Sequence, residues 1–172
     1  MPPHDAEALL FRKGATLTID QEEFRRVLGH FASGVTIVTT HSHGSNYGIT
    51  VSSFTSLSLA PRLVLICIDH QVVSLQAIRS AGFFAVNVLG EDGEHLSRRF
   101  ASHEVDKFSG VAFRIGLTGA PLLDDALAIL ECAVVQEVEG GDHTIFMGEV
   151  RAMATGAGKP LLYYRSGYHQ LA

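Results

Sequence analysis

The chain has 172 residues, a length that suits one domain with a sizeable hydrophobic core. Hydrophobic residues make up 47% and charged residues 18%, which excludes a disordered chain, and the formal net charge of −5 argues against nucleic acid as the main partner. We therefore expect a soluble globular protein that does not bind nucleic acid.

Neither the start of the chain nor its apolar runs indicate export or membrane insertion. The first ten residues, MPPHDAEALL, hold acidic residues and no long apolar core, which argues against a signal peptide. Apolar runs such as residues 63–68 are too short to span a bilayer. Cys67 and Cys132 lie in apolar strand-like runs without a neighbouring cation, so we expect buried free thiols in a reducing compartment. These features predict a cytoplasmic protein with no membrane partner.

The N-terminal part predicts an arm followed by an amphipathic helix. Residues 1–18 are expected to form a loose arm. Asp20, with Glu23 three residues later, is typical of a helix N-cap. Apolar residues then follow at helical spacing between residues 24 and 31. We predict that this helix ends near Gly34.

A hairpin with an irregular second half is predicted next. Residues 35–40 are rich in β-branched side chains, a Gly/Asn turn follows, and residues 49–51 form a second strand. From residue 49 the apolar residues stand at odd positions up to Val51, at an even position at Phe54, and at an odd position again at Leu57. Because side chains alternate faces along a strand, each change predicts a bulge or a turn. Such a segment can hold an anionic polar ligand through free N–H groups and hydroxyls, although ordinary turn chemistry is the alternative. The hydroxyls belong to Ser52, Ser53, Thr55, Ser56 and Ser58.

The rest of the chain predicts strands that follow one another without long crossover helices. This order favours an antiparallel barrel with helices packed outside over a parallel doubly wound sheet. No repeat or domain boundary is visible, so we expect a single domain over residues 1–172. The expected elements are a turn at Ala60-Pro61, strands at 62–69, 83–89, 128–138, 144–153 and 160–164, a helix from a Ser74 cap to Gly82, a second helix at 91–103, and an irregular stretch at 104–126.

Familiar catalytic and nucleotide motifs are absent. The chain has no G-x-G-x-x-G after a strand, no P-loop and no G-x-S-x-G elbow, so Rossmann, P-loop and serine hydrolase sites are not supported. His41 and His43 lie in a turn without a nearby carboxylate, so no metal site is predicted.

The adjacent Arg98 and Arg99 fit either a phosphate contact or a solvated helix face. His143, in a Gly-Gly-Asp-His turn, is either a functional group or an ordinary exposed histidine.

Several segments occur in an order typical of one known family: FASGVTIVTT, G-x-T-x-SSFTSLS at 48–58, FFAVNVL, LSRRFA, KF, GAPLLDDALAILEC, GDHTIFMGEV and PLLYYRSGYH. From about Phe24 to His169 the chain resembles the flavin reductase-like family, and more narrowly the small reductase component of two-component flavin-dependent monooxygenases. The resemblance implies a mainly β fold with short helices, a split antiparallel β-barrel of the flavin-reductase/FMN-binding type, which usually forms a homodimer. Residues 1–18 are not explained by it.

The resemblance also implies a reaction. NADH or NADPH gives a hydride to FMN or FAD, and the reduced flavin leaves for a partner monooxygenase. Because the two cofactors carry the chemistry, the protein needs no nucleophile, and the nicotinamide can bind directly against the flavin. The alternatives are a flavin-binding electron carrier or sensory protein without turnover, an oxidase of the pyridoxamine-phosphate type, and a ligand-carrier barrel. The oxidase needs a richer Arg/Lys site, and the carrier does not explain the motif order.

Carried over residue by residue, the resemblance assigns His143 as the catalytic residue near the nicotinamide, with Tyr168 on that same side. Backbone N–H groups and hydroxyls between residues 50 and 55 are expected to stabilise charge on the reduced flavin. The cofactor-binding residues are Ser33, Gly34, Val35, Thr36 and Ile37 on the first strand, Thr50, Val51, Ser52, Ser53, Phe54 and Thr55 along the ring and ribityl chain, Asn87 on a nearby strand, Ser97, Arg98 and Arg99 at the phosphate side, then Lys107, Phe108 and Tyr168.

Overall fold

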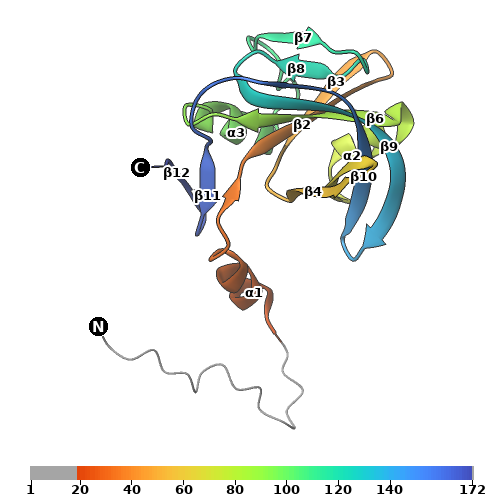
Figure 1. Cartoon of the computed structure of the whole chain (residues 1–172). Helices are drawn as coiled ribbons and strands as arrows, with labels where there is room; N and C mark the ends of the chain where they lie inside the picture. The colour runs from red at the N-terminus through yellow and green to blue at the C-terminus, as the bar shows by residue number, and fades with distance from the viewer. Residues whose placement is uncertain (1–18, 172) are drawn as a thin grey trace, which may run out of the picture.

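A computed structural model describes residues 19–171, so the predicted arm at 1–18 lies outside the described residues (Figure 1). The described part is mainly β with three short helices, α1 (Gln21–Leu28), α2 (Val73–Ala81) and α3 (Glu94–Ala101). None of these helices is long and apolar enough to cross a membrane. The strands are β1 (Ser33–Gly34), β2 (Thr36–Ser42), β3 (Ser45–Val51), β4 (Phe54–Leu59), β5 (Arg62–Asp69), β6 (Phe83–Leu89), β7 (Phe113–Ile115), β8 (Pro121–Leu123), β9 (Ala126–Gly140), β10 (His143–Thr155), β11 (Leu162–Tyr164) and β12 (Gly167–His169).

Seven strands form one sheet in the order β3-β2-β6-β9-β10-β5-β4, and every pair in it is antiparallel. Consecutive strands are joined by turns or short helices, which is why antiparallel neighbours result. The two edge strands, β3 and β4, are not hydrogen-bonded to each other, yet only residues 52–53 separate them in the chain. The sheet therefore curls into a barrel that is split between β3 and β4, and the predicted fold class is confirmed.

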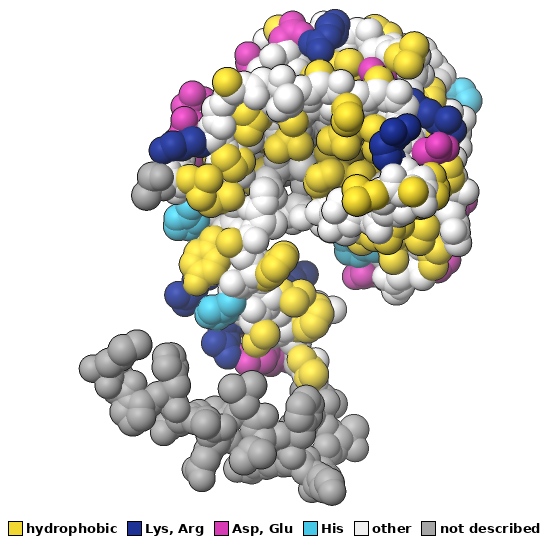
Figure 2. Space-filling model, viewed as in Figure 1, with side chains coloured by type: hydrophobic (Ala, Val, Ile, Leu, Met, Phe, Trp, Pro, Cys, Tyr) yellow, Lys and Arg dark blue, Asp and Glu magenta, His cyan; other side chains and the backbone are white. Residues whose placement is uncertain are grey.

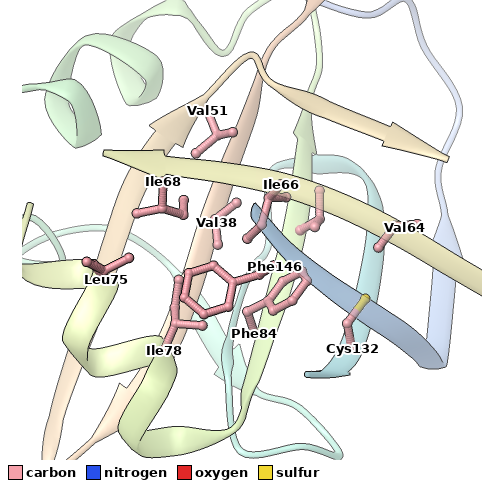
Figure 3. Packing of buried hydrophobic residues seen from close by; sticks show 11 residues of the cluster. Val38, Val51, Val64, Ile66, Ile68, Leu75, Ile78, Phe84, Cys132 and Phe146 are labelled. Carbon is pink, nitrogen blue, oxygen red and sulfur yellow. The ribbon is translucent and has the colours of Figure 1, made fainter. Parts of the chain in front are cut away.

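Alternating side chains build the core inside this barrel (Figure 3). Along β5, Val64, Ile66 and Ile68 are buried while the residues between them are not, as expected for a strand with one face on a core. Figure 3 shows these side chains in one cluster with Phe146 of the neighbouring strand β10 and Phe84 of the more distant strand β6. Helix α2 adds Leu75 and Ile78 to the same cluster. The core thus fixes β5, β10 and α2 relative to one another.

Helix α1 is the element least attached to the barrel. Its predicted cap is confirmed, since the Glu23 amide donates to Asp20 Oδ1 at 2.8 Å. The predicted end near Gly34 is wrong, because the helix ends at Leu28. The amides of His30 and Phe31 donate to the carbonyls of Val27 and Leu28, which tightens the last turn. Ser33–Gly34 forms β1 and pairs with β11. The helix buries none of its residues and projects from the body in Figure 1.

Two other sequence predictions need correction. Helix α2 begins at Val73 after a Val72 cap without a side-chain bond, so Ser74 is not the cap; it is buried one residue further in. Its end at Gly82 is confirmed, with a positive φ of 72° that favours glycine. The stretch 104–126 is not wholly irregular, because β7 and β8 pair within it.

The predicted irregularities near the hydroxyl run are confirmed. Val51 and Phe54 both pack on the barrel core although they lie three residues apart, which requires the break in strand structure at 52–53. The register of β4 against β5 shifts between Ser56 and Ser58, so Leu57 is a bulged residue. Leu57 and Leu59 are exposed by 45% and 90%. The chain therefore presents the hydroxyls of residues 52–55 at the split and an apolar surface just beyond it.

Candidate functional site

The split between β3 and β4 gathers exposed hydroxyl groups. Ser52, Ser53 and Thr55 are exposed, and Ser53 Oγ donates to the Cys67 carbonyl of β5 at 3.0 Å. Because β3 and β4 are edge strands, each also has backbone N–H and C=O groups that no neighbouring strand satisfies. This combination of hydroxyls and unpaired backbone groups suits a flat, polar-edged ligand.

Helix α3 closes one end of the split. A Cβ added at Gly48 of β3 would clash with the Phe100 ring of α3, so only glycine allows this close approach. Two residues further along β3, Thr50 Oγ1 donates to the Ser97 carbonyl at 2.6 Å. The helix is therefore fixed directly on β3.

Tyr168 joins the C-terminal segment to this end of the site. Its hydroxyl shares a 2.8 Å hydrogen bond with the buried Ser97 hydroxyl, and Arg98 Cζ lies 5.0 Å from its ring centroid in a cation–π contact. The sequence resemblance assigns Tyr168 to the nicotinamide side, whereas the structure places it against the arginine-bearing helix. Its contact with a cofactor stays a prediction.

The two arginines of α3 differ in their partners. Arg98 forms an ion pair with Glu94 at 2.7 Å and points to solvent, and this pairing raises the pKa of Arg98. Arg99 Nε is buried and makes no hydrogen bond among residues 19–171, but it forms a long ion pair with Glu104 Oε2 at 3.8 Å. Both guanidinium groups are therefore already paired with glutamates, and a contact of Arg98 or Arg99 with a flavin phosphate stays a prediction.

His143 lies at the opposite end of the site, at the start of β10. It pairs with Asp69 of β5, while Ile145 pairs with Cys67, whose carbonyl holds Ser53. His143 and Ser53 both lie on the outer face of the sheet, about 12 Å apart from the strand spacing and rise. This separation lets one extended ligand, or two ligands in contact, touch both residues.

The histidine ring has one nitrogen engaged and one free. His143 Nδ1 lies 2.7 Å from Asp142 Oδ1, and this hydrogen bond lowers the pKa of Asp142. An ionised carboxylate only accepts hydrogen bonds, so Nδ1 carries the proton and donates. The half-exposed ring then offers Nε2 to a ligand on the outer face.

Five residues assigned to cofactor binding are buried beneath the site. Their partners are structural: Thr36 Oγ1 donates to the Val51 carbonyl at 2.7 Å, and Asn87 Nδ2 donates to the Ile37 carbonyl at 3.0 Å. The Asn87 side chain also accepts from the Leu123 amide at 2.8 Å. These side chains support the strands under the split, and a direct cofactor contact stays a prediction for Val35, Thr36, Ile37, Val51 and Asn87.

The remaining assigned residues surround α3 and the first strand. Lys107 Nζ donates to the Phe100 carbonyl at 2.8 Å, and burial lowers the pKa of Lys107. Phe108 packs edge-to-face on Phe100, with ring centroids 5.1 Å apart. Both residues thus hold the loop after α3 in place. Ser33 is half-buried, Gly34 is exposed, and a Cβ at Gly34 would meet open space.

A further hollow lies outside the split. It has a volume of about 520 Å³ and is lined by residues 90–93, His95, residues 124–127 and residues 156–159, none of which the sequence assigned to a site. Its walls include Glu91, Asp92, Asp124 and Asp125. Its four carboxylates outnumber the one lysine, Lys159, and repel a phosphate, so we assign the ligand site to the hydroxyl-lined split and not to this hollow.

Sequence reasoning missed the residues that hold the His143 end. Arg79 of α2 bonds Glu137 at 2.7 Å, and His70 Nε2 lies 3.1 Å from Glu139. The bond with Glu137 raises the pKa of Arg79. No local pattern indicates these pairs, because 58 or more positions separate their members in the chain.

Comparisons with known proteins identify the family. A family model described as "Flavin reductase like domain" matches residues 28–172. The reductase component of the 4-nitrophenol 4-monooxygenase/4-nitrocatechol 2-monooxygenase of Rhodococcus opacus is 47% identical over 150 residues, which cover 87% of this chain and 80% of that protein. An NADH-dependent FAD reductase of Streptomyces globisporus is 46% identical over 136 residues, covering 76% of this chain and 74% of the relative.

A solved structure shares the fold over most of both chains. The NADH:FAD oxidoreductase SgcE6 of Streptomyces globisporus C-1027, in complex with NAD and FAD fragments, superimposes with a TM-score of 0.86 and 42% identity. The superposition covers 89% of this chain and 93% of that one.

Proposed function

The chain belongs to the flavin reductase-like family, and we propose that it is an NAD(P)H:flavin oxidoreductase that supplies reduced flavin to a partner monooxygenase. The observation that carries the proposal is the split itself: exposed hydroxyls lie between β3, against which the arginine-bearing helix α3 packs, and a hairpin that presents His143. Named relatives that are reductase components of monooxygenases support the link to such a partner.

Each part of the site has a separate task in this reaction. A bound flavin supplies the hydride-accepting ring, so the protein contributes binding and orientation. The hydroxyls of Ser52, Ser53 and Thr55 and the free backbone groups hydrogen-bond the polar edge of that ring. Arg99 holds the phosphate, and His143 Nε2 orients the nicotinamide from the other end. Orientation matters because hydride transfer needs donor and acceptor atoms about 3–3.5 Å apart.

We propose FAD and NADH as the preferred pair. The support is the 46% identity to a relative named NADH-dependent FAD reductase and the likeness to an NADH:FAD oxidoreductase. Steady-state assays that cross FMN and FAD with NADH and NADPH test this choice. Turnover highest with FAD and NADH is expected, and a preference for FMN or NADPH would overturn the pairing.

The same assays test the activity. The proposal fails if the purified protein oxidises neither nicotinamide with either flavin. Tightly bound, stoichiometric flavin without turnover would instead identify an electron carrier or sensory flavoprotein.

We also propose a homodimer of single-domain subunits. An isolated helix of eight residues is marginal in water, yet α1 exposes Phe24 and Val27, and Phe31 is exposed just after it. Figure 2 shows hydrophobic side chains on this projecting part of the molecule. Leu59 and Met153 expose a second apolar surface, on the barrel. A second copy of the chain supplies a matching partner for both surfaces through a two-fold interface.

Sedimentation velocity tests the dimer. Phe31→Glu or Leu59→Glu should convert the dimer to monomers, because each puts a charge into an apolar interface. Ile115→Glu, at a residue that is 58% exposed on β7, is the matched control and should leave the dimer intact. A monomeric wild-type protein would refute the homodimer.

We place the protein in the cytoplasm. Its two cysteines, Cys67 and Cys132, are both free thiols, as is usual in reducing compartments. Burial also raises the pKa of Cys132 to about 12, so this thiol is inert. Cell fractionation tests the location, and recovery with periplasmic or secreted proteins would contradict it.

A further inference from the structure

The hairpin that carries His143 is held from behind by side chains of another element. The tip of this hairpin comprises residues 139–144, between the end of β9 and the start of β10. Arg79, in the last turn of α2, reaches it with three contacts: Nε to Glu137 at 2.7 Å, Nη2 to Glu139 at 3.2 Å, and Nη2 to Thr144 Oγ1 at 3.2 Å. A planar guanidinium that meets three partners fixes both strands of the hairpin at once.

His70 makes a second connection from the turn after β5. Its backbone amide donates to the Asp142 carbonyl at 3.0 Å. Its ring Nε2 lies 3.1 Å from both Glu139 Oε2 and Thr144 Oγ1. Arg79 and His70 therefore share Glu139 and Thr144 as partners, and together they form one network around the tip.

This network lies on the face of the hairpin opposite to His143. Thr144 is fully buried, and successive side chains of a strand point to opposite faces, so His143 points outward. Glu139 lies opposite Thr144 in the β9–β10 register, and Glu137 lies opposite the buried Phe146. All four side chains are therefore on the inner face. Arg79 thus has no access to a ligand on the outer face, and it can influence that ligand only by holding the hairpin.

We propose that Arg79, assisted by His70, is a positioning residue for the nicotinamide end of the site. It fixes the tip so that His143 keeps its distance to the split, and its loss loosens nicotinamide binding without affecting the flavin end. This inference rests on the proposed role of His143 in orienting the nicotinamide.

The test compares Arg79→Gln, Arg79→Lys and the matched control Arg114→Gln. Arg114 forms a similar exposed pair with Asp124 at 3.0 Å, on the small β7–β8 sheet. Arg79→Gln should raise the KM for NADH about fivefold while the KM for flavin changes less than twofold, and Arg79→Lys should restore part of the loss because it keeps the charge. Arg114→Gln should change neither constant. Equal rises in both KM values, or no rise in either, would overturn the proposal.

A second measurement needs no cofactor. Amide hydrogen exchange at residues 141–144 of the protein alone should become faster in Arg79→Gln and stay unchanged in Arg114→Gln. Unchanged exchange at the tip in Arg79→Gln would refute the positioning role.

A double variant shows whether Arg79 acts through His143. In a His143→Ala background, Arg79→Gln should have no further effect on the KM for NADH. Full additivity would refute the inference. A wild-type protein without flavin reductase turnover would remove the proposed function itself, and faster exchange in Arg79→Gln would then still show that Arg79 holds the hairpin.

Discussion

The two ends of the site are built from different interactions. At the α3 end, neutral hydrogen bonds among Thr50, Ser97 and Tyr168 join the helix to β3 and to the C-terminal segment, and the exposed ion pair of Arg98 with Glu94 lies within the helix itself. At the hairpin end, exposed ion pairs link Arg79 and His70 to glutamates. Neutral bonds sheltered from water barely respond to salt or pH, whereas exposed ion pairs do. Under the proposed assignment, the end that holds the flavin phosphate is the more rigid of the two, and the end that orients the nicotinamide is the more adjustable.

The largest effect is expected at the contact between β3 and α3. Gly48→Ala puts a methyl group against the Phe100 ring, so the helix must move, at a cost of about 2 kcal/mol. We expect lower thermal stability and weaker flavin binding, measured by thermal unfolding and by flavin fluorescence. Gly90→Ala is the matched control, because its nearest neighbour would be 3.8 Å away. Wild-type stability and flavin affinity in Gly48→Ala would show that this contact does not hold the α3 end.

A smaller loss is expected when the Ser97–Tyr168 bond is removed. Tyr168→Phe leaves the buried Ser97 hydroxyl without its tyrosine partner, which costs about 1–2 kcal/mol. Flavin affinity should fall while the KM for NADH stays unchanged. Tyr163→Phe is the control, since Tyr163 meets Tyr168 through its ring at 5.4 Å. A selective rise in the KM for NADH would instead return Tyr168 to the nicotinamide side.

Salt should distinguish the two ends in the protein alone. Raising sodium chloride to about 0.5 M screens the exposed pairs of Arg79, so amide exchange at residues 141–144 should accelerate about twofold. Exchange in β3, which the neutral bond between Thr50 and Ser97 joins to α3, should stay constant. Equal acceleration at both ends would abolish the proposed contrast.

The smallest effect concerns the pH dependence of the Asp142–His143 pair. The hydrogen bond from His143 lowers the pKa of Asp142 from its ordinary value of 3.8. A lowered pKa in the folded state means that this contribution to stability is present above the ordinary value and is lost as the pH falls through the lowered one. Titration of the Asp142 carboxyl carbon by NMR should show a midpoint below 3.8 that rises in His143→Ala. An identical midpoint in that variant would mean that the pair does not form in solution.

Local patterns in the sequence predicted much of the fold. Alternating apolar residues predicted most strands, the Asp20 and Gly82 patterns predicted helix boundaries, and the parity changes predicted the break at residues 52–53. These features depend on residues a few positions apart, which is why they can be read along the chain. The helix end at Leu28 was missed because pairing of Ser33–Gly34 with the distant β11 determines it.

The sequence by itself determined the family, the split barrel and the hydroxyl run, because motif order and side-chain alternation are properties of the chain alone. Only the tertiary structure decided which assigned residues face the split, that Tyr168 lies against α3, and that Arg79 holds the hairpin of His143. Those contacts join residues 58 or 71 positions apart, and their formation depends on strand register and helix placement. Register follows from the packing of the whole core, which no short stretch of sequence encodes.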